Sequence, residues 1–295
     1  MAETGDGVWE VKPSELAMAE PKEICGKGKS GTVHKAVHSS TGKVAALKVV
    51  TIALLKGSDV VVKQLSDLYR SNHPNVAAFY GAEYDTSKSQ MMIAFEYMDR
   101  RSLKDLLQKN GPIPELVMSV GCKHMLAGLN YLHDTRHIVH RDIKPSNVLV
   151  SSEGMFKITD FGMSKELTEA IPQGDTWVGT SLYMSPERVG GEKHSYNADV
   201  WSLGIVAVEC CTGACPFGDS NSSDACSMDA LDMIVDGDPP TLPHDKFSPQ
   251  AVDFVSLCCT KSATERPGCN LLLDHPFLGL HAPEKAKDWL ATAKF

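Results

Sequence analysis

The chain has 295 residues, of which 42% are hydrophobic and 22% are charged, as is ordinary for a soluble globular protein of one large domain or two lobes. Its formal net charge of -8 argues against a general nucleic-acid binder and against a protein that binds anionic membranes. The longest apolar run, near residues 203–211, is too short to cross a bilayer, so we expect no membrane insertion.

The cysteines and the N-terminus indicate the compartment. Nine cysteines occur at irregular positions without a CxxC pair, which is typical of free thiols in a reducing environment. The first residues, MAETGDGVWE, show neither a secretory signal nor a glycine at position 2 for myristoylation. We therefore expect a cytoplasmic protein that can also shuttle to the nucleus. Residues 1–20 show no sustained periodicity and predict a flexible lead-in.

A G-x-G-x-x-G pattern is the first chemical feature along the chain. Its glycines are Gly26, Gly28 and Gly31, with Lys27 between the first two and Val33 two residues after the last. Glycines let a backbone approach phosphates and present N–H groups to them. A Rossmann fingerprint would need a helix next, but residues 32–50 read as two strands joined by a turn, and a Walker A loop would need a glycine at Glu23. Two readings remain, a glycine-rich hairpin that closes over a nucleotide and an ordinary hairpin.

A single lysine, Lys48, interrupts the apolar strand predicted over residues 44–50. Such a lysine must leave the sheet at the strand end or meet an anionic partner. After a phosphate-cradling hairpin, the α- and β-phosphates of a nucleotide are the natural partner.

Charged and amide side chains recur between residues 138 and 162 at a spacing that suits phosphoryl transfer. Asp142 can orient a substrate hydroxyl, and Lys144 can meet the migrating phosphate. Asn147 and Asp160 can hold Mg²⁺. A solvated loop between two hairpins would need only single charges, not this ordered set.

These motifs together resemble the eukaryotic protein kinases over roughly residues 21–280. The matching stretches are GKGKSGTV, AALK, HRDIKPSN, DFG and SPE, the last at residues 185–187 in place of the commoner APE. Finer matches resemble the mitogen-activated protein kinase kinase family. They are FYGA (79–82), EYMD (96–99), VGT-x-x-YMSPER (178–188), ADVWSLG (198–204), LDMIVDGDPPTLP (231–243) and ERP (265–267).

The resemblance implies an α+β, bilobal protein-kinase fold. A small antiparallel β-sheet N-lobe with one helix would span about residues 21–97, and a hinge would follow at about 96–100. A larger, mainly α-helical C-lobe would extend to residue 278, and the tail at 279–295 suits a short helix.

The same resemblance implies binding of ATP with Mg²⁺ between the lobes. Lys48 would hold the α- and β-phosphates, Phe95 would be the gatekeeper, and the backbone of Glu96 and Met98 would bind adenine. The full set of expected nucleotide contacts is Gly26, Lys27, Gly28, Gly31, Val33, Ala46, Lys48, Phe95, Glu96, Met98, Lys144, Ser146, Asn147, Leu149 and Asp160.

Partners follow from the family alone. Its members phosphorylate a Thr and a Tyr in the activation loop of a downstream MAP kinase, and an upstream MAP kinase kinase kinase activates them. The basic-plus-apolar docking peptide usual in the family is absent from residues 1–20, which leaves the mode of substrate recruitment open.

Gln64 is the main departure from the family. It lies on a helix predicted over residues 58–71, where active kinases have a glutamate that pairs with the strand lysine, here Lys48. A neutral hydrogen bond is only about half as strong as a charge-assisted one. The alternatives are an active kinase, another Ser/Thr kinase of the same cascade, and a weakly active or pseudokinase-type scaffold. Arg100-Arg101 also replaces the paired glycines typical of the family.

The segment at residues 163–180 has no periodicity and resembles an activation loop. A phosphate on Thr176 could pair with Arg141 and order this loop. Pro172 stands where the family usually has a further hydroxyl, and Thr168 is a nearby candidate with the wrong spacing. Thr180 is expected to hydrogen-bond the catalytic Asp142 and Lys144.

Further charges are expected to be structural. Glu187 and Arg266 should both be buried and therefore paired. Asp199, which opens an apolar helix, should accept hydrogen bonds from backbone N–H groups of the catalytic loop.

Overall fold

The chain folds into two compact units. The computed structural model describes residues 9–20, 23–28, 31–51, 58–161, 181–192, 195–219 and 227–295; in strand β2 and helix α1, the side chains of residues 27, 28, 58–60 and 64 are not described. Described residues up to Arg101 form the first unit, and those from Ser102 onward form the second. The first is built on an antiparallel sheet and the second is mainly helical, which confirms the expected α+β, bilobal fold.

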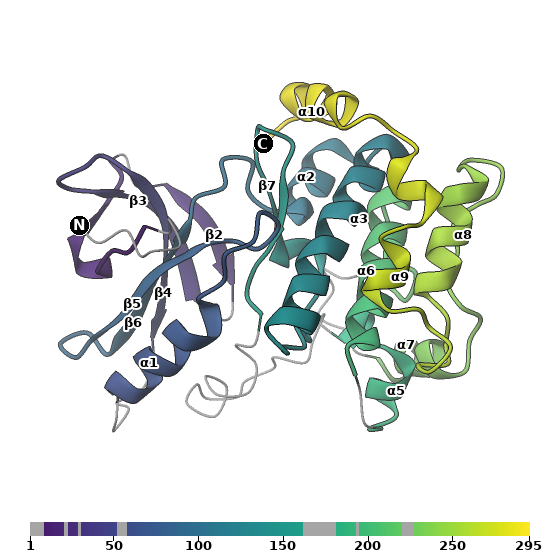
Figure 1. The fold of residues 1–295 in the computed structure, drawn as a ribbon, viewed down its shortest axis with the longest axis horizontal. Coiled ribbons are helices and arrows are strands. Elements are labelled where there is room, and N and C mark those ends of the chain that lie inside the picture. The colour runs from purple at the N-terminus through teal and green to yellow at the C-terminus, as the bar shows by residue number, and fades with distance from the viewer. Residues whose placement is uncertain are drawn as a thin grey trace. The chain divides into compact units, whose positions relative to one another are not determined.

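The first unit is an antiparallel sheet with the order β1-β3-β4-β6-β5, in which β2 also pairs with β3 (Figure 1). Its strands are β1 (Leu16–Met18), β2 (Ile24–Gly28), β3 (Gly31–His38), β4 (Val44–Thr51), β5 (Phe79–Asp85) and β6 (Gln90–Glu96). Helix α1 (Ser58–Tyr69) packs on β5, where the Tyr69 ring stacks on Phe79 at 5.8 Å.

The N-terminal segment corrects one sequence prediction. A flexible lead-in over residues 1–20 is wrong for the part from Trp9 to Met18, which contains a 3₁₀ turn, Pro13–Glu15, and strand β1. Val11 and Leu16 are buried against Ala36, Ala45, Leu47 and Ala94 on one face of the sheet. The Val11 N–H donates to the Tyr80 carbonyl at 2.9 Å. Order here comes from this distant sheet, which a local pattern cannot reveal.

The second unit packs its helices around α6, whose residues from Ala198 to Cys211 are all buried. Its helices are α2 (Leu103–Asn110), α3 (Glu115–Asn130), α5 (Pro186–Val189), α6 (Asn197–Thr212), α7 (Met228–Val235), α8 (Pro249–Cys258), α9 (Cys269–Leu272) and α10 (Pro283–Thr292). A π-turn (Tyr131–Thr135) continues α3, and 3₁₀ turns span Pro145–Asn147, Ser181–Tyr183 and Pro276–Gly279.

Between these helices a short hairpin of β7 (Val148–Val150) and β8 (Phe156–Ile158) carries the catalytic motifs. The expected tail helix is α10, which packs on α3 through a face that buries Ala286 and Leu290 (Figure 1). Every cysteine in the described ranges is a free thiol. Within those ranges, no helix is both long and apolar enough to cross a membrane.

Candidate active site

The first unit gathers the expected nucleotide contacts on one face of its sheet. In the strand register, Val33 pairs with Lys48, and Ala46 pairs with Phe95. Directly paired residues of antiparallel strands share a face, as do residues two apart on one strand. These four side chains therefore lie on one face, opposite the face that the N-terminal segment covers. Lys48 is only 4% exposed, so its charge lies inside the protein.

Glycines of the hairpin differ in what they contribute. Gly31 has φ +126°, and a Cβ there would lie 2.4 Å from the Val49 carbonyl oxygen, so the sheet itself requires glycine. A Cβ on Gly26 would make only ordinary contact with Val33, at 3.9 Å. Packing does not require Gly26, which leaves close approach of a ligand as a reason for it. The backbone of Lys27 pairs with Thr32, and that of Gly28 pairs with Gly31.

The segments before β2 and after β6, together with β3, form a charged cluster that the sequence did not predict. Glu23 lies 3.3 Å from the Lys35 ammonium and 3.6 Å from the Arg101 guanidinium, and it accepts a hydrogen bond from the Tyr97 hydroxyl. Burial acts to raise the pKa of Glu23, but its interactions with Lys35, Tyr97 and Arg101 together outweigh burial and hold the pKa below its ordinary value. Arg101 has φ +57°, a conformation that suits the glycine of the family. We call Glu23, Lys35, Tyr97 and Arg101 the surface cluster.

In the second unit, the catalytic loop brings Asp142, Lys144 and Asn147 together. The Asn147 side-chain amide donates to the Asp142 carboxylate and to its backbone oxygen, both at 2.8 Å. The Lys144 ammonium lies 2.9 Å from the other Asp142 carboxylate oxygen. Both oxygens are thus oriented, as a group that accepts a substrate proton requires.

The backbone of this loop is fixed by Asp199, at the start of α6. Its buried carboxylate accepts hydrogen bonds from the N–H groups of His140 and Arg141, both at 2.8 Å, as the sequence predicts. It also contacts His133 Nε2 at 2.8 Å. Burial acts to raise the pKa of Asp199, but its interactions with His133, His140 and the Arg141 N–H together outweigh burial, so the pKa lies below its ordinary value. Asp199 therefore stays ionised at neutral pH.

His140 is a second buried support for the loop. Burial lowers its pKa, so the ring is neutral at neutral pH. Its Nδ1 accepts the N–H of Asp142 at 3.3 Å, and its Nε2 lies 3.0 Å from the Thr159 carbonyl oxygen. These partners place the ring proton on Nε2. One imidazole thus joins the loop of Asp142 to the residue before Asp160.

The hairpin of β7 and β8 places Asn147 and Asp160 at neighbouring ends of two paired strands. Asn147 precedes β7, and its carbonyl accepts the Thr159 N–H at 3.0 Å. The amide nitrogen of Asn147 donates to Asp142. Its amide oxygen accepts a long hydrogen bond from the Ser146 hydroxyl, at 3.5 Å, and has a second lone pair for a metal. Oxygen ligands suit Mg²⁺, which commonly completes its shell with phosphate oxygens and water. Within the described part of the chain, no group of three or more His, Cys, Asp and Glu side chains could hold a metal ion.

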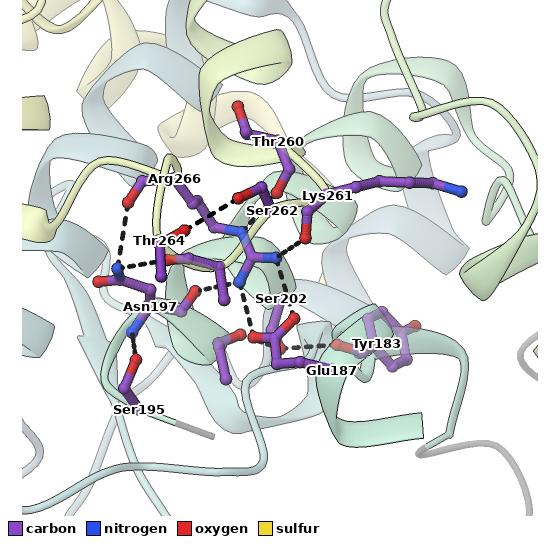
Figure 2. A network of polar contacts seen from close by, with 12 residues as sticks. Tyr183, Glu187, Ser195, Asn197, Ser202, Thr260, Lys261, Ser262, Thr264 and Arg266 are labelled. Atoms are coloured by element: carbon purple, nitrogen blue, oxygen red, sulfur yellow. Dashed lines mark hydrogen bonds and ion pairs between the residues drawn. The ribbon is translucent and has the colours of Figure 1, made fainter. Parts of the chain in front are cut away.

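Glu187 and Arg266 form the expected buried ion pair (Figure 2). Two parallel hydrogen bonds, of 2.9 and 3.1 Å, join the guanidinium to the carboxylate. The other three N–H groups of Arg266 donate to the carbonyls of Thr260, Asn197 and Lys261. All five donors are satisfied, which is the condition for a buried guanidinium to be tolerated.

The remaining predicted residues are placed by the structure in some cases and lie outside its described part in others. Ser146 lies in the 3₁₀ turn before β7, and Leu149 pairs with Lys157. Glu96 ends β6, and Met98 is buried in the next turn. The backbone of Gln64 lies in α1, but its side chain is outside the described part, as are residues 162–180 with Thr168, Thr176 and Thr180.

Comparisons with known proteins agree with this geometry. A family model of the protein kinase domain matches residues 19–278. The chain is 38% identical over 275 residues to mitogen-activated protein kinase kinase 2 of Arabidopsis thaliana, covering 91% of this chain and 75% of that protein. It is 36% identical over 275 residues to the dual specificity mitogen-activated protein kinase kinase dSOR1 of Drosophila melanogaster, covering 86% of this chain and 68% of that protein.

Proposed function

This chain belongs to the protein kinase family, among the mitogen-activated protein kinase kinases, and on that premise we propose that it phosphorylates the activation loop of a downstream MAP kinase. The acceptors are Thr and Tyr hydroxyls, and the donor is the γ-phosphate of ATP. An upstream kinase activates it by phosphorylating Thr176. The free thiols of the described chain support a reducing compartment such as the cytoplasm.

The orientation of Asp142 carries this proposal. A kinase needs a carboxylate that accepts the hydroxyl proton in a fixed direction, because phosphoryl transfer depends mostly on positioning and electrostatics. Asn147 and Lys144 hold one carboxylate oxygen each, at 2.8 and 2.9 Å. The ammonium of Lys144, which lies beside Asp142, would offset negative charge that develops on the transferred phosphate.

Asn147 and Asp160 would hold Mg²⁺, which neutralises charge on the phosphates of the nucleotide. The amide nitrogen of Asn147 donates to Asp142, and the amide oxygen keeps a lone pair for the metal beside its long bond from the Ser146 hydroxyl. Loss of Asp160 should therefore abolish transfer, while loss of Asn147 should also release the Asp142 carboxylate. In the first unit, buried Lys48 supplies a positive charge on the face where phosphates are expected.

The test is a radiolabelled-ATP assay on a panel of catalytically inactive MAP kinases, after activation of the enzyme by an upstream kinase. Wild type should label at least one panel member, and Asp142→Ala should be slower by several orders of magnitude. Equal labelling by both proteins would refute the proposal that this chain is a kinase. Phosphoamino acid analysis decides the acceptors, since label on Ser and Thr without Tyr would favour another Ser/Thr kinase of the cascade.

Gln64 supports a second candidate, a nucleotide-binding scaffold without transferase activity. It stands on α1 at the position where the family carries the glutamate partner of the strand lysine. This candidate predicts no phosphate transfer by the wild type or by the variant Thr176→Glu, which mimics activation. A large gain in Gln64→Glu would show that the missing charge limits an otherwise competent site.

A further inference from the structure

Arg188 connects two parts of the second unit that the catalytic motifs do not account for. It lies on the short helix α5, directly after Glu187. Its guanidinium donates to the Arg141 carbonyl oxygen at 2.9 Å, across 47 positions of sequence. The side chain is half-buried, and the bond lies within the second unit. No catalytic motif calls for this bond.

The acceptor belongs to an unusual residue. Arg141 has φ +69°, in the left-handed region, which is strained for a non-glycine residue and persists only where neighbours enforce it. Its N–H is held by Asp199. Its carbonyl is held by Arg188. Both backbone polar groups of Arg141 are therefore hydrogen-bonded to charged side chains.

The carbonyl of Arg141 and the N–H of Asp142 share one rigid peptide plane. At one end of this plane Arg188 donates to the carbonyl, and at the other the N–H donates to His140 Nδ1 at 3.3 Å. With both ends held, this plane is fixed and so are the N and Cα atoms of Asp142. The next peptide plane is held as well, because the Asp142 carbonyl accepts a hydrogen bond from the Asn147 amide at 2.8 Å. The two planes together set the direction of the Cα–Cβ bond of Asp142.

The electrostatic surroundings match this arrangement. Burial lowers the pKa of Arg188, while the carboxylates of Asp199 and Asp142 act to raise it. Guanidinium stays protonated in proteins, so these carboxylates face a permanent cation. The backbone of Arg188 is also held in place, because the neighbouring residue Glu187 is fixed by its buried hydrogen bonds to Arg266.

We propose that Arg188 is a positioning residue for the reaction: it holds the peptide plane before Asp142 so that the carboxylate points at the substrate hydroxyl. It does so as the link from the Glu187–Arg266 anchor to the catalytic loop. Arg188 itself touches neither nucleotide nor acceptor. The inference rests on the proposed kinase function.

The test compares kcat, KM for ATP and thermal unfolding in Arg188→Lys, Arg188→Gln and Arg188→Met. It uses the activated enzyme and, as acceptor, the catalytically inactive MAP kinase of the panel that wild type labels best. Displacement of a catalytic group by about 1 Å costs about 100-fold, so Arg188→Met should lower kcat by about 10- to 100-fold with KM for ATP within about threefold. Lys retains a charged donor and should restore most of kcat, and Gln should be intermediate.

Lys261→Met is the matched control, because Lys261 also donates to main-chain carbonyls, those of Val235 and Gly237. It should change thermal unfolding without changing kcat. Wild-type kcat in Arg188→Met, or equal loss in the Lys and Met variants, would overturn the proposal. If Arg188→Met does not fold, kcat in Arg188→Gln equal to that in Arg188→Lys would overturn it.

Asp142→Asn sets the baseline for the function itself. Wild type no faster than Asp142→Asn contradicts the kinase, whereas an active wild type with an unaffected Arg188 series contradicts only the positioning role. Hydrogen exchange gives a reading that does not need activity. The amides of residues 140–142 should exchange faster in Arg188→Met than in Lys261→Met, and equal rates would overturn the proposal.

Discussion

Each unit contains its own group of paired charged side chains, but one group is buried and the other lies at the surface. In the second unit, Glu187 and Arg266 meet inside the protein, and their side chains are 5% and 0% exposed. In the first unit, Glu23 meets Lys35 and Arg101 at the surface, with side chains between 31% and 37% exposed. The buried pair has two parallel hydrogen bonds, whereas the surface cluster has contacts of 3.3 and 3.6 Å.

The difference determines what each group of charges can do. A buried charge cannot turn to water, so each of its donors must meet an acceptor in one geometry, and it therefore fixes the backbone around it. A surface pair exchanges freely with water and is screened by salt. Accordingly the buried charges surround the catalytic loop, where geometry matters, and we expect the surface cluster to contribute little stability.

Arg266→Met gives the largest expected effect. It leaves Glu187 buried without its partner, which should cost about 3–5 kcal/mol of the free energy of unfolding in urea. Glu187→Gln combined with Arg266→Met removes the orphaned charge and should recover part of the loss. A cost below about 1 kcal/mol would erase the distinction between buried and surface charges.

Asp199→Asn should have the next effect. In the wild type, two backbone N–H groups donate to the two carboxylate oxygens of Asp199, at 2.8 Å each. In the variant, one of these oxygens is replaced by an NH₂ group, which is itself a donor and cannot accept the bond. Hydrogen bonds to charged groups contribute about 1.5–3 kcal/mol, so unfolding should cost about 2–4 kcal/mol less and kcat should fall. Asp253→Asn is the control, because this exposed carboxylate pairs only with His275 among the described residues. An equal loss in both variants would contradict the assigned role.

Acid should weaken the second unit in two stages. Burial, with a smaller contribution from Lys123, lowers the pKa of His124 from 6.5 to about 4. The unfolded chain therefore binds this proton first, and stability is lost as pH falls from about 6.5 to about 4, by up to about 3 kcal/mol. Below about pH 4.5, Glu187 and Asp199 add a second loss, because their folded-state pKa values are lowered.

Urea unfolding at pH 7 and pH 4.5 measures the first stage. His124→Gln should reduce the loss of stability between these two pH values. Part of the loss should remain, because burial also lowers the pKa of His140. His244→Gln, at an exposed position, should leave it unchanged. Equal pH slopes in His124→Gln and wild type would show that the imidazole titrates alike in the folded and unfolded chain.

The sequence predicted the residues whose chemistry dictates their type. Asp142, Asn147 and Asp160 were predicted because phosphoryl transfer needs groups of these types at this spacing, and the structure brings the side chains of Asp142 and Asn147 together. The two-unit fold was predicted from the same motifs. The Glu187–Arg266 pair was predictable for a related reason: a charge in a segment expected to be buried must have a partner.

Contacts that depend on distant backbone were not predictable. Val11 is ordered by the Tyr80 carbonyl, an acceptor that every residue carries and that no side chain announces. The bond from Arg188 to the Arg141 carbonyl is hidden for the same reason. The surface cluster joins Glu23 to Tyr97 across 74 positions, and only the strand register brings them together.

Glu23→Gln and Arg101→Gly give the smallest expected effects. Glu23→Gln removes two exposed ion pairs, so the free energy of unfolding should change by less than about 1 kcal/mol, and less still at high salt. Arg101→Gly loses one pair but gains a residue suited to φ +57°, so the two contributions should nearly cancel. If Glu23→Gln instead cost several kcal/mol at high salt, exposure would not separate the two regions, and the surface cluster would have to be counted with the buried charges as a determinant of geometry.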